Sequence, residues 1–432
     1  MRTSKLIGSA AALAVLSFAF LPSVSSSGTG LATAGSYAPV CLPAAAVGVA
    51  NCDAIQLLNP AVNWHGSHVP VISAGKGNGK GPGGGGGGGG GGGSSTPSGY
   101  QPADLQSAYN LATASANNGS GMTVAIVDAY NDPNALQDVN VYRSEWGIPQ
   151  LNSSTTPAVF SQVNGDGGSS LPRNNSSWSE EISLDLDMVS AICPKCNIML
   201  VEANSASLVD LGTAVNYAAN NGASVISNSY GASEFNGETT YDKYYKHLGI
   251  PITVSAGDSG YGVEYPAASQ YVTAVGGTTL KGSPTTPWSQ TVWSGTGSGC
   301  SQYEPNPGWQ PSISGVCSNR TVADTSAVAD PYTGVAVYDS FHEPGWMVFG
   351  GTSVASPIIA SVYALAGPGT WSSTSVPASY LYGPSLNEVT QGSNGSCGNY
   401  LCDATHSLTF LNNGIFYNGP TGVGTPNGLT GF

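Results

Sequence analysis

The order of apolar and polar residues after residue 100 changes repeatedly between two patterns. Short apolar runs bounded by glycine or polar residues are typical of buried strands, and apolar residues three and four positions apart are typical of helices. The predicted strands are residues 123–127, 197–202, 223–227, 251–255 and 271–275; the predicted helices are 133–146, 207–220 and 238–248. Alternating strands and helices predict an α/β fold with a mainly parallel sheet and helices on both faces.

A further helical pattern begins directly after two glycines, in the sequence GGTSVASPIIASVYALAG of residues 350–367. It places Ser353 at the amino end of the helix, near free N–H groups and the positive end of the helix dipole. An anionic intermediate formed on this hydroxyl would be stabilised there, so Ser353 is a candidate nucleophile. Serines at this position are also common helix caps, and the motif alone leaves both roles open.

Three acidic residues occupy positions suited to chemistry. Asp258 follows a short buried strand in SAGDSG, at the carboxyl end where active groups gather in parallel sheets. Glu181 and Asp185 lie four residues apart in SEEISLDLDMVS and therefore share one helix face. A solvated face is the ordinary role of such acids. This chain of 432 residues has only 25 acids, however, and three of them fall at these positions.

Composition excludes some partners. Only 8% of the residues are charged and the formal net charge is −14, so neither nucleic acid nor an anionic membrane is an expected partner. Residues 1–27 have the basic start, apolar run and small residues of a secretory signal peptide, which predicts a secreted, extracellular protein. The apolar run is too short for a membrane anchor, and no later segment is long enough to span a bilayer.

Eight cysteines form four pairs that are close in sequence. The expected disulfides are Cys41–Cys52, Cys193–Cys196, Cys300–Cys317 and Cys397–Cys402. The CPKC sequence at Cys193 is also compatible with redox or zinc chemistry, but a second CxxC and a nearby histidine are missing. A structural bridge is therefore the interpretation adopted for this pair.

Residues 28–98 form a short segment with one cysteine loop and a run of eleven glycines at 83–93. Such a run cannot pack and marks a flexible linker, so we expect the folded domain to span residues 99–432.

Several motifs in the expected order together resemble the sedolisins, the serine-carboxyl peptidases. They are YQPADLQSAYN at residue 100, TVAIVDAYNDP at 123, VISNSYG at 225, YPAASQYVTAVGGTTL at 265, RTVADTSAVADPYTGVAVYD at 320 and GGTSVASP at 350. The resemblance implies a subtilisin-like three-layer fold with a mainly parallel central sheet flanked by helices. It also implies a peptide or protein substrate, and we expect a monomer.

The resemblance assigns four catalytic roles. Ser353 is the nucleophile, Glu181 the general base, Asp185 its partner and Asp258 the acid of the oxyanion hole. The chemistry is consistent, because two adjacent carboxyls share a proton and Asp258 must be protonated to donate a hydrogen bond, which favours acidic pH. The implied substrate-binding residues are Ser227, Ser229, Tyr230, Gly231 and Gly257.

Two alternatives to this catalytic set deserve a test against the structure. The sequence WHGSHVP, with His65 and His68, resembles a subtilisin histidine motif, but it precedes Asp128 and lies on the wrong side of the glycine run. Asp128 would be the subtilisin aspartate, and we expect it to be structural. If the family motif were aligned slightly differently along this helix, Glu180 and Asp187 would take the places of Glu181 and Asp185.

The family's calcium site is only partly retained. Its positions correspond to Glu388, Val389, Gly414 and Asn418, where Glu388 and Asn418 replace two aspartates. One longer acid and one amide lower the charge and change the reach of the ligands, so the sequence leaves calcium binding open. Internal cleavage or release of tripeptides also stays open, as does a catalytically silent relative that only binds peptides.

Overall fold

The structure is a computed structural model that describes residues 36–43, 46–58, 97–152, 158–310, 316–383, 386–409 and 414–432. All of these belong to one compact unit, Ala34–Phe432. The predicted signal peptide of residues 1–27, the glycine run of 83–93, and His65 and His68 lie outside the described residues.

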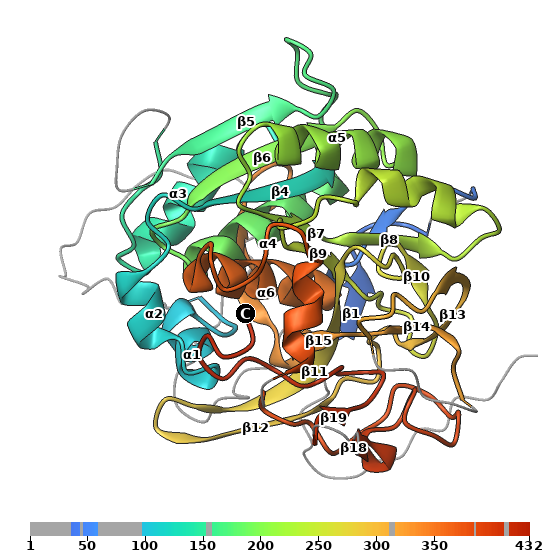
Figure 1. Cartoon of the computed structure of the whole chain (residues 1–432). Coiled ribbons are helices and arrows are strands. Elements are labelled where there is room, and N and C mark those ends of the chain that lie inside the picture. The colour runs from blue at the N-terminus through green and yellow to red at the C-terminus, as the bar shows by residue number, and fades with distance from the viewer. Residues whose placement is uncertain are drawn as a thin grey trace, which may run out of the picture. The chain divides into compact units, whose positions relative to one another are not determined.

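A mostly parallel sheet forms the centre of this unit (Figure 1). Its strands, in spatial order, are β12 (Thr286–Val292), β11 (Thr273–Ser283), β9 (Ile252–Ser255), β7 (Val225–Asn228), β4 (Thr123–Ala129), β6 (Asn197–Ala203) and β5 (Phe160–Asn164). Strand β15 (Thr325–Val328) also pairs with β11. All pairs from β11 to β5 are parallel, and only β12 joins antiparallel. The predicted α/β class with a mainly parallel sheet is confirmed.

Helices cover both faces of the sheet and define two apolar cores. The helices are α1 (Pro102–Ala108), α2 (Ala112–Asn117), α3 (Ala135–Glu145), α4 (Ser176–Ile192), α5 (Leu208–Asn220) and α6 (Thr352–Ala366). Along β4, Val124 and Ile126 face the core of α4 and α6, whereas Ala125 and Val127 face the core of α5. Because side chains alternate along a strand, Asp128 faces α4 and α6.

Most predicted elements are present with small shifts at their ends. The predicted helix of residues 238–248 is instead a 3-10 helix, η1 (Glu238–Tyr244), and the strand predicted at 271–275 is β11, which runs on to Ser283. The prediction missed strand β5, which is parallel to β6, and the antiparallel strands outside the main parallel run. The missed antiparallel strands include β12, β13 (Gly299–Pro305), β14 (Asn319–Val322), β16 (Val335–Asp339), β17 (Gly345–Gly350), β18 (Leu408–Thr409) and β19 (Phe416–Tyr417). Three further 3-10 turns are η2 (Pro331–Thr333), η3 (Pro377–Tyr382) and η4 (Ala404–His406).

Three short strands that precede residue 99 pair with the rest of the unit. Strand β1 (Ser36–Pro39) is antiparallel to β3 (Ile55–Leu58), and β3 pairs with β17. Strand β2 (Asn51–Cys52) pairs with β8 (Tyr230–Ser233), which also pairs with β10 (Glu264–Tyr265). The expected domain start near residue 99 did not anticipate this pairing.

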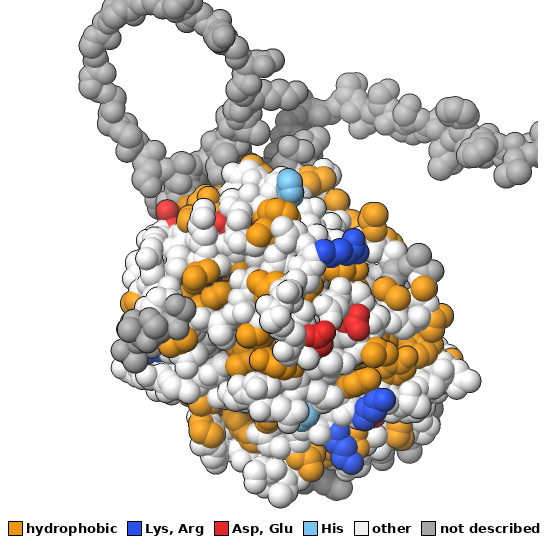
Figure 2. Space-filling view, turned by 90° about the horizontal axis from the view of Figure 1, so that it is seen from above, with side chains coloured by type: hydrophobic (Ala, Val, Ile, Leu, Met, Phe, Trp, Pro, Cys, Tyr) orange, Lys and Arg blue, Asp and Glu red, His pale blue; other side chains and the backbone are white. Residues whose placement is uncertain are grey.

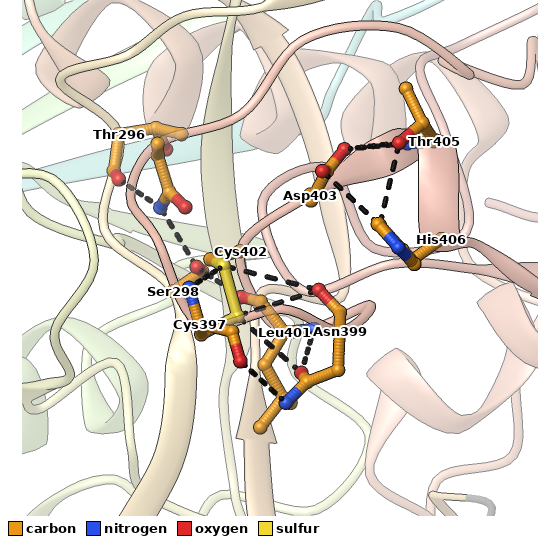
Figure 3. Close-up of a disulfide and its surroundings, with 10 residues drawn as sticks. Thr296, Ser298, Cys397, Asn399, Leu401, Cys402, Asp403, Thr405 and His406 are labelled. Atoms are coloured by element: carbon orange, nitrogen blue, oxygen red, sulfur yellow. Dashed lines mark hydrogen bonds and ion pairs between the residues drawn. A yellow bond between two sulfur atoms is a disulfide. The ribbon is translucent and has the colours of Figure 1, made fainter.

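All four expected disulfides are formed. Figure 3 shows the Cys397–Cys402 bridge, whose loop is fastened to the β12–β13 region through Ser298. The Ser298 hydroxyl donates to the carbonyl of Leu401 at 2.6 Å and accepts from the Asn394 amide at 2.8 Å. Redox or zinc chemistry at Cys193 and Cys196 receives no support, because these two sulfurs are bonded to each other.

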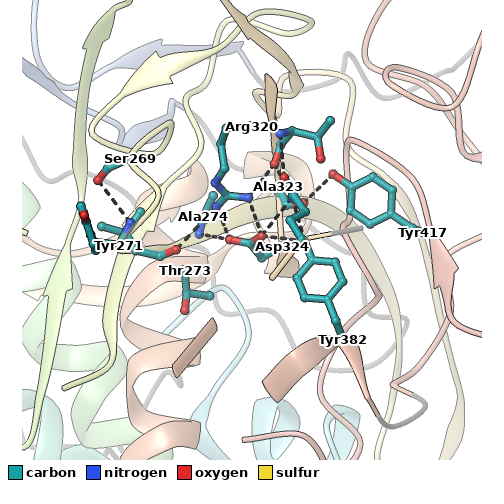
Figure 4. Close-up of polar contacts among 12 residues, drawn as sticks. Ser269, Tyr271, Thr273, Ala274, Arg320, Ala323, Asp324, Tyr382 and Tyr417 are labelled. Carbon is teal, nitrogen blue, oxygen red and sulfur yellow. Dashed lines mark hydrogen bonds and ion pairs between the residues drawn. The ribbon is translucent and has the colours of Figure 1, made fainter. Parts of the chain in front are cut away.

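A buried ion pair joins the carboxyl-terminal region to the sheet (Figure 4). The Arg320 guanidinium donates to both carboxylate oxygens of Asp324, which also accepts from the Tyr382 hydroxyl at 2.7 Å and from the backbone N–H of Ala274 at 2.8 Å. Both charged side chains are fully buried. Four donors therefore satisfy one carboxylate, as burial of a charge requires.

Charged side chains are few on the molecular face in Figure 2, and they are scattered among polar and apolar groups. None of the helices among the described residues is long and apolar enough to cross a membrane. Many of the carboxyl groups lie instead in the interior.

We predict that Asp324→Asn lowers the free energy of unfolding by about 3–5 kcal/mol, because Arg320 would remain buried without its countercharge. The matched control is Asp403→Asn, since Asp403 pairs with His406 at 3.1 Å on the surface and should change stability by less than about 1 kcal/mol. Urea unfolding at one fixed pH measures both. Equal effects of the two variants would contradict the structural role of the buried pair.

Candidate active site

Ser353 lies in the first turn of α6, at the point where β17 turns into the helix. The turn requires Gly351, whose φ of +98° is unfavourable for other residues. Pro357, four residues after Ser353, has no N–H and therefore leaves the Ser353 carbonyl without its helical donor. The Ser229 hydroxyl donates to that carbonyl at 3.5 Å. The glycine and the proline thus fix the start of the helix that carries the serine.

Glu181 and Asp185 project from α4, one turn apart, and both are fully buried. Both oxygens of Asp185 lie 2.8 Å from the Ser229 hydroxyl. The oxygens of Glu181 have no well-aligned hydrogen-bond partner among the described residues. The Ser353 hydroxyl lies beside Glu181 and partly offsets the rise in its pKa, but it donates to the Ser229 carbonyl at 3.4 Å. The serine and its predicted base are therefore adjacent without a formed hydrogen bond between them.

Asp128 belongs to the same cluster. It lies at the end of β4 and faces α4, and both its oxygens are buried without a hydrogen-bond partner in the described part of the chain. Burial raises its pKa to about 8. Its charge also raises the pKa of Glu181 and of Asp185. An electrostatic effect thus adds to the structural role expected of Asp128, since its charge disfavours ionisation of the other two carboxyls.

The carboxyls around Ser353 are therefore protonated more readily than carboxyls in water. Burial raises the pKa values of Glu181 and Asp185 well above their usual range, and the charge of Asp185 adds to the effect on Glu181. Two such groups on adjacent turns cannot both ionise without a large cost, so they share protons.

Asp258 follows β9 and faces the amino end of α6. Its Oδ1 accepts from the Thr352 backbone N–H at 2.7 Å and from the Thr352 hydroxyl at 2.8 Å. Its Oδ2 has no partner among the described residues. Burial raises the pKa of Asp258 well above its usual range. Its free oxygen is therefore suited to carry a proton and to donate it in a hydrogen bond.

A stretch of the chain's own residues lies across Ser353. The carbonyl oxygen of Asp53 accepts from the Ser353 backbone N–H at 3.1 Å. A methyl group built at Gly351 would lie 2.1 Å from this carbonyl oxygen and 2.5 Å from Oδ2 of Asp258, so both oxygens face the same small space. The Asp53 carbonyl oxygen thus lies close to one N–H donor, that of Ser353, and to one carboxyl that can donate when protonated, that of Asp258.

The five predicted substrate-binding residues have different neighbours. Ser229 and Gly231 contact residues 51–53 through their backbone, because the Asp53 N–H donates to the Ser229 carbonyl at 3.2 Å and Asn51 lies opposite Gly231. Gly257 lies beside Glu264, and a side chain there would meet it. The side chains of the remaining two point away from residues 51–53: the Ser227 hydroxyl meets Ser356 at 3.2 Å, and the Tyr230 hydroxyl donates to Asn228 at 2.9 Å.

The acids next to the predicted pair have other neighbours. Asp187 accepts from the backbone N–H of Tyr338 at 2.9 Å. Burial raises the pKa of Glu180 to about 8, and the charges of Glu343 and Asp339 add to this effect. These contacts favour the register in which Glu181 and Asp185 face Ser353.

The four predicted calcium positions do not match a calcium site. Asn418 is buried, and its amide nitrogen donates to the Val389 carbonyl at 3.0 Å while its oxygen accepts from the Thr421 backbone N–H. The Val389 carbonyl, which a cation would need as a ligand, is therefore already hydrogen-bonded to this amide. The side-chain oxygen of Asn418 is likewise hydrogen-bonded. Glu388 and Gly414 are exposed. No group of three or more acidic, histidine or cysteine side chains suited to a metal occurs within the described residues.

Sequence reasoning missed Asp53 and Ser255 as components of this region. The Ser255 hydroxyl donates to Oδ2 of Asp53 at 2.6 Å, although the two residues are 202 positions apart. Only the pairing of β2 with β8 brings them together, and no local motif indicates it. The carboxyl of Glu264 is also buried here.

Comparison with known proteins agrees with this fold and site. A model of the subtilase family matches residues 170–376. Kumamolisin of Bacillus sp. (strain MN-32) is 28% identical over 377 residues, covering 78% of this chain and 63% of that protein. Sedolisin of Pseudomonas sp. (strain 101) is 28% identical over 345 residues, covering 71% and 57%. The chain thus spans about six tenths of the length of these curated relatives.

The fold comparison gives the same grouping. A solved structure of Pseudomonas sedolisin, described as a serine-carboxyl proteinase complexed with two molecules of pseudo-iodotyrostatin, superposes with a TM-score of 0.64 and 27% identity, covering 77% of this chain and 96% of that one. The fold is therefore similar to that of the subtilisin-like serine peptidases. Within this class the chain is similar to the sedolisins.

We predict that the folded protein is most stable in acid. The buried carboxyls have raised pKa values, about 7 for Asp53 and about 8 for Asp128, so folded molecules keep protons that unfolded molecules lose above their ordinary pKa near 4. The stabilisation is complete below that ordinary value and is lost as the pH rises through about 7–8. Each such group contributes a slope of about 1.4 kcal/mol per pH unit.

Urea unfolding at pH 4, 6 and 8 measures this dependence. Asp128→Asn removes one titrating group, so the free energy of unfolding should depend on pH less steeply, by about 1.4 kcal/mol per pH unit. Asp403→Asn on the surface should leave this dependence unchanged. Equal or greater stability at pH 8 than at pH 4 would contradict the buried protons.

Proposed function

We propose that this chain is an acid-active serine-carboxyl endopeptidase that is exported from the cell. The observation that carries the proposal is the placement of the Ser353 hydroxyl beside the coupled carboxyls of Glu181 and Asp185. The partly free carboxyl of Asp258 completes the set on the other side of Ser353. Four disulfides are consistent with an oxidising, extracellular location.

The proposed reaction begins with one proton held between the carboxyls of Glu181 and Asp185, so that ionised Glu181 accepts the proton of Ser353 while Oγ attacks the peptide carbonyl. The Ser353 backbone N–H and protonated Asp258 donate hydrogen bonds to the oxyanion that forms. Glu181 then transfers the proton to the leaving amine as the carbon–nitrogen bond breaks. Water repeats these steps on the ester and releases the acid. Asp185, held by Ser229, adjusts the affinity of Glu181 for the proton.

This assignment predicts hydrolysis of denatured protein below roughly pH 5 and a fall in the rate as the pH rises and Asp258 loses the proton that it donates to the oxyanion. Ser353→Ala and Glu181→Gln should each lower kcat by about 10⁴-fold or more, and Asp258→Asn by about 10²–10³-fold. Ser361→Ala, a buried serine on the same helix, is the matched control and should keep full activity.

The assay includes an acid incubation of the purified full chain, because Ser353 is buried beneath residues 51–56. Covalent labelling by a serine-directed reagent or an aldehyde peptide provides a second readout. A wild type that is neither labelled nor active would favour a silent peptide-binding relative. Activity that peaks at pH 7–8 would refute the proton-sharing mechanism.

Calcium forms no part of the proposed mechanism, since the Asn418 amide fills its own site with hydrogen bonds. We predict that a chelator leaves the Tm unchanged, and that added calcium does not raise it. The double variant Glu388→Asp/Asn418→Asp restores the two aspartates, which adds one carboxylate, and should make the Tm depend on calcium. A fall of several degrees on chelation of the wild type would contradict this.

A further inference from the structure

Residues 51–56 run past Ser353 and pair with a strand on each side of it. On the amino side, β2 adds antiparallel to β8, with Asn51 opposite Gly231 and Cys52 opposite Tyr230. On the carboxyl side, Ile55 lies opposite Gly350 at the end of β17. Figure 1 shows these amino-terminal strands, in blue, beside β8 and the sheet edge. Addition of a strand to a cleft edge is a common way to bind an extended peptide.

The register presents one particular bond to the serine. The Asp53 carbonyl oxygen accepts from the Ser353 N–H, and its N–H donates to the Ser229 carbonyl. Asp53 is therefore the residue on the acyl side of the presented bond, and Ala54 is on the amine side.

The side chain of Asp53 enters a polar pocket. Only 5% of the residue is exposed, and its Oδ2 accepts from the Ser255 hydroxyl at 2.6 Å. The pocket is bounded by Gly231 and Gly257, where an added methyl would lie 2.2 Å and 2.7 Å from the carboxyl of Glu264. The absence of side chains at these two glycines leaves room for that carboxyl. One oxygen of Glu264 is buried and has no partner among the described residues.

We propose that this pocket selects a carboxyl side chain, aspartate above others, on the acyl side of the bond that is cut, and that Ser255 and Glu264 read it. The Asp53–Ala54 bond is the example that the chain carries itself. The inference rests on the proposed peptidase function and names its substrate class.

The chemistry of the pocket favours a neutral acid over other side chains. A protonated carboxyl both donates and accepts, so it can accept from the Ser255 hydroxyl, as Asp53 does, and still has a proton to offer to Glu264, whose pKa the charge of Asp53 raises. Leucine would leave both groups buried without partners. Lysine would require ionised Glu264, and burial opposes this in acid by raising its pKa well above the usual range. The raised pKa of Asp53, about 7, agrees with a neutral occupant.

Cleavage of the presented bond is balanced by groups at the site. Ser353 Oγ forms an ester with the Asp53 carbonyl, the bond to Ala54 breaks, and the serine proton passes through Glu181 to the new amine. Water then hydrolyses the ester. Because β1 pairs with β3, and these strands lie on opposite sides of the cut, the two pieces stay paired in the folded protein.

Peptides of the form Ala-Asn-Ser-X-Ala-Ile-Gln, with X as Asp, Asn, Leu or Lys, test the pocket after acid incubation of the full chain. At pH 4 we expect kcat/KM for Asp to exceed that for Asn and Leu by about tenfold or more, with a smaller preference at pH 6. Ser255→Ala should lower the ratio of Asp to Leu cleavage. Ser326→Ala, a buried serine of β15 that donates to Thr421, should leave this ratio unchanged.

Equal or faster cleavage at Leu or Lys would overturn the inference, and so would a ratio unmoved by Ser255→Ala. Mass spectrometry after denaturation provides a second readout, since a fragment that begins at Ala54 should arise in the wild type, more slowly in Asp53→Leu, and not in Ser353→Ala. Cutting of Asp53→Leu as fast as the wild type would also overturn it. If denatured protein is hydrolysed and Ser353 is labelled but the preference for Asp is absent, only the proposed selectivity is wrong. If neither hydrolysis nor labelling occurs, the proposed peptidase function is wrong too.

Discussion

The site depends on burying several carboxyl groups around one hydroxyl. An ionised carboxylate in such a place costs several kcal/mol, and no cation accompanies Glu181, Asp185 or Asp128 among the described contacts. The cluster avoids this cost by retaining protons, and one unit of pKa shift corresponds to about 1.4 kcal/mol. The buried ion pair of Arg320 and Asp324 shows the other solution, in which a guanidinium and two further donors satisfy one charge. Only the retention of protons by the carboxyls leaves protons that can move during catalysis.

The backbone around the cluster is arranged so that these protons have defined acceptors. Gly351 allows the tight entry into α6, and Pro357 frees the Ser353 carbonyl for Ser229. Ser229 thus contacts both Asp185 and Ser353, because its hydroxyl lies 2.8 Å from Asp185 and its carbonyl accepts from the Ser353 hydroxyl. Sequence-distant elements are thereby tied together by one serine. A change at Ser229 would alter the nucleophile and the carboxyl pair at once, which is why its effects should not be additive with theirs.

Local patterns sufficed for part of this arrangement. The helix start at Ser353 and the four-residue spacing of Glu181 and Asp185 are local, and the structure brings these residues together as predicted. The burial of Asp128 was not predicted, because its direction depends on the alternation along β4 and on which face α4 covers. Asp53 could not be found at all. It reaches Ser255 only because β2 and β3 join strands that are far away in sequence, and short strands with mixed polarity leave no periodic signal.

The occupied cleft and the acidic chemistry are physically linked. With residues 51–56 in place, water is excluded from Ser353 and from the carboxyls, and burial is the largest cause of every raised pKa in the cluster. Departure of these residues would hydrate the cluster and lower those pKa values. A substrate that takes their place restores the dry environment and again favours the protonated form of Asp258. The proton needed for the oxyanion is therefore held most firmly when a peptide is bound, so substrate binding itself helps to prepare the acid that the reaction requires.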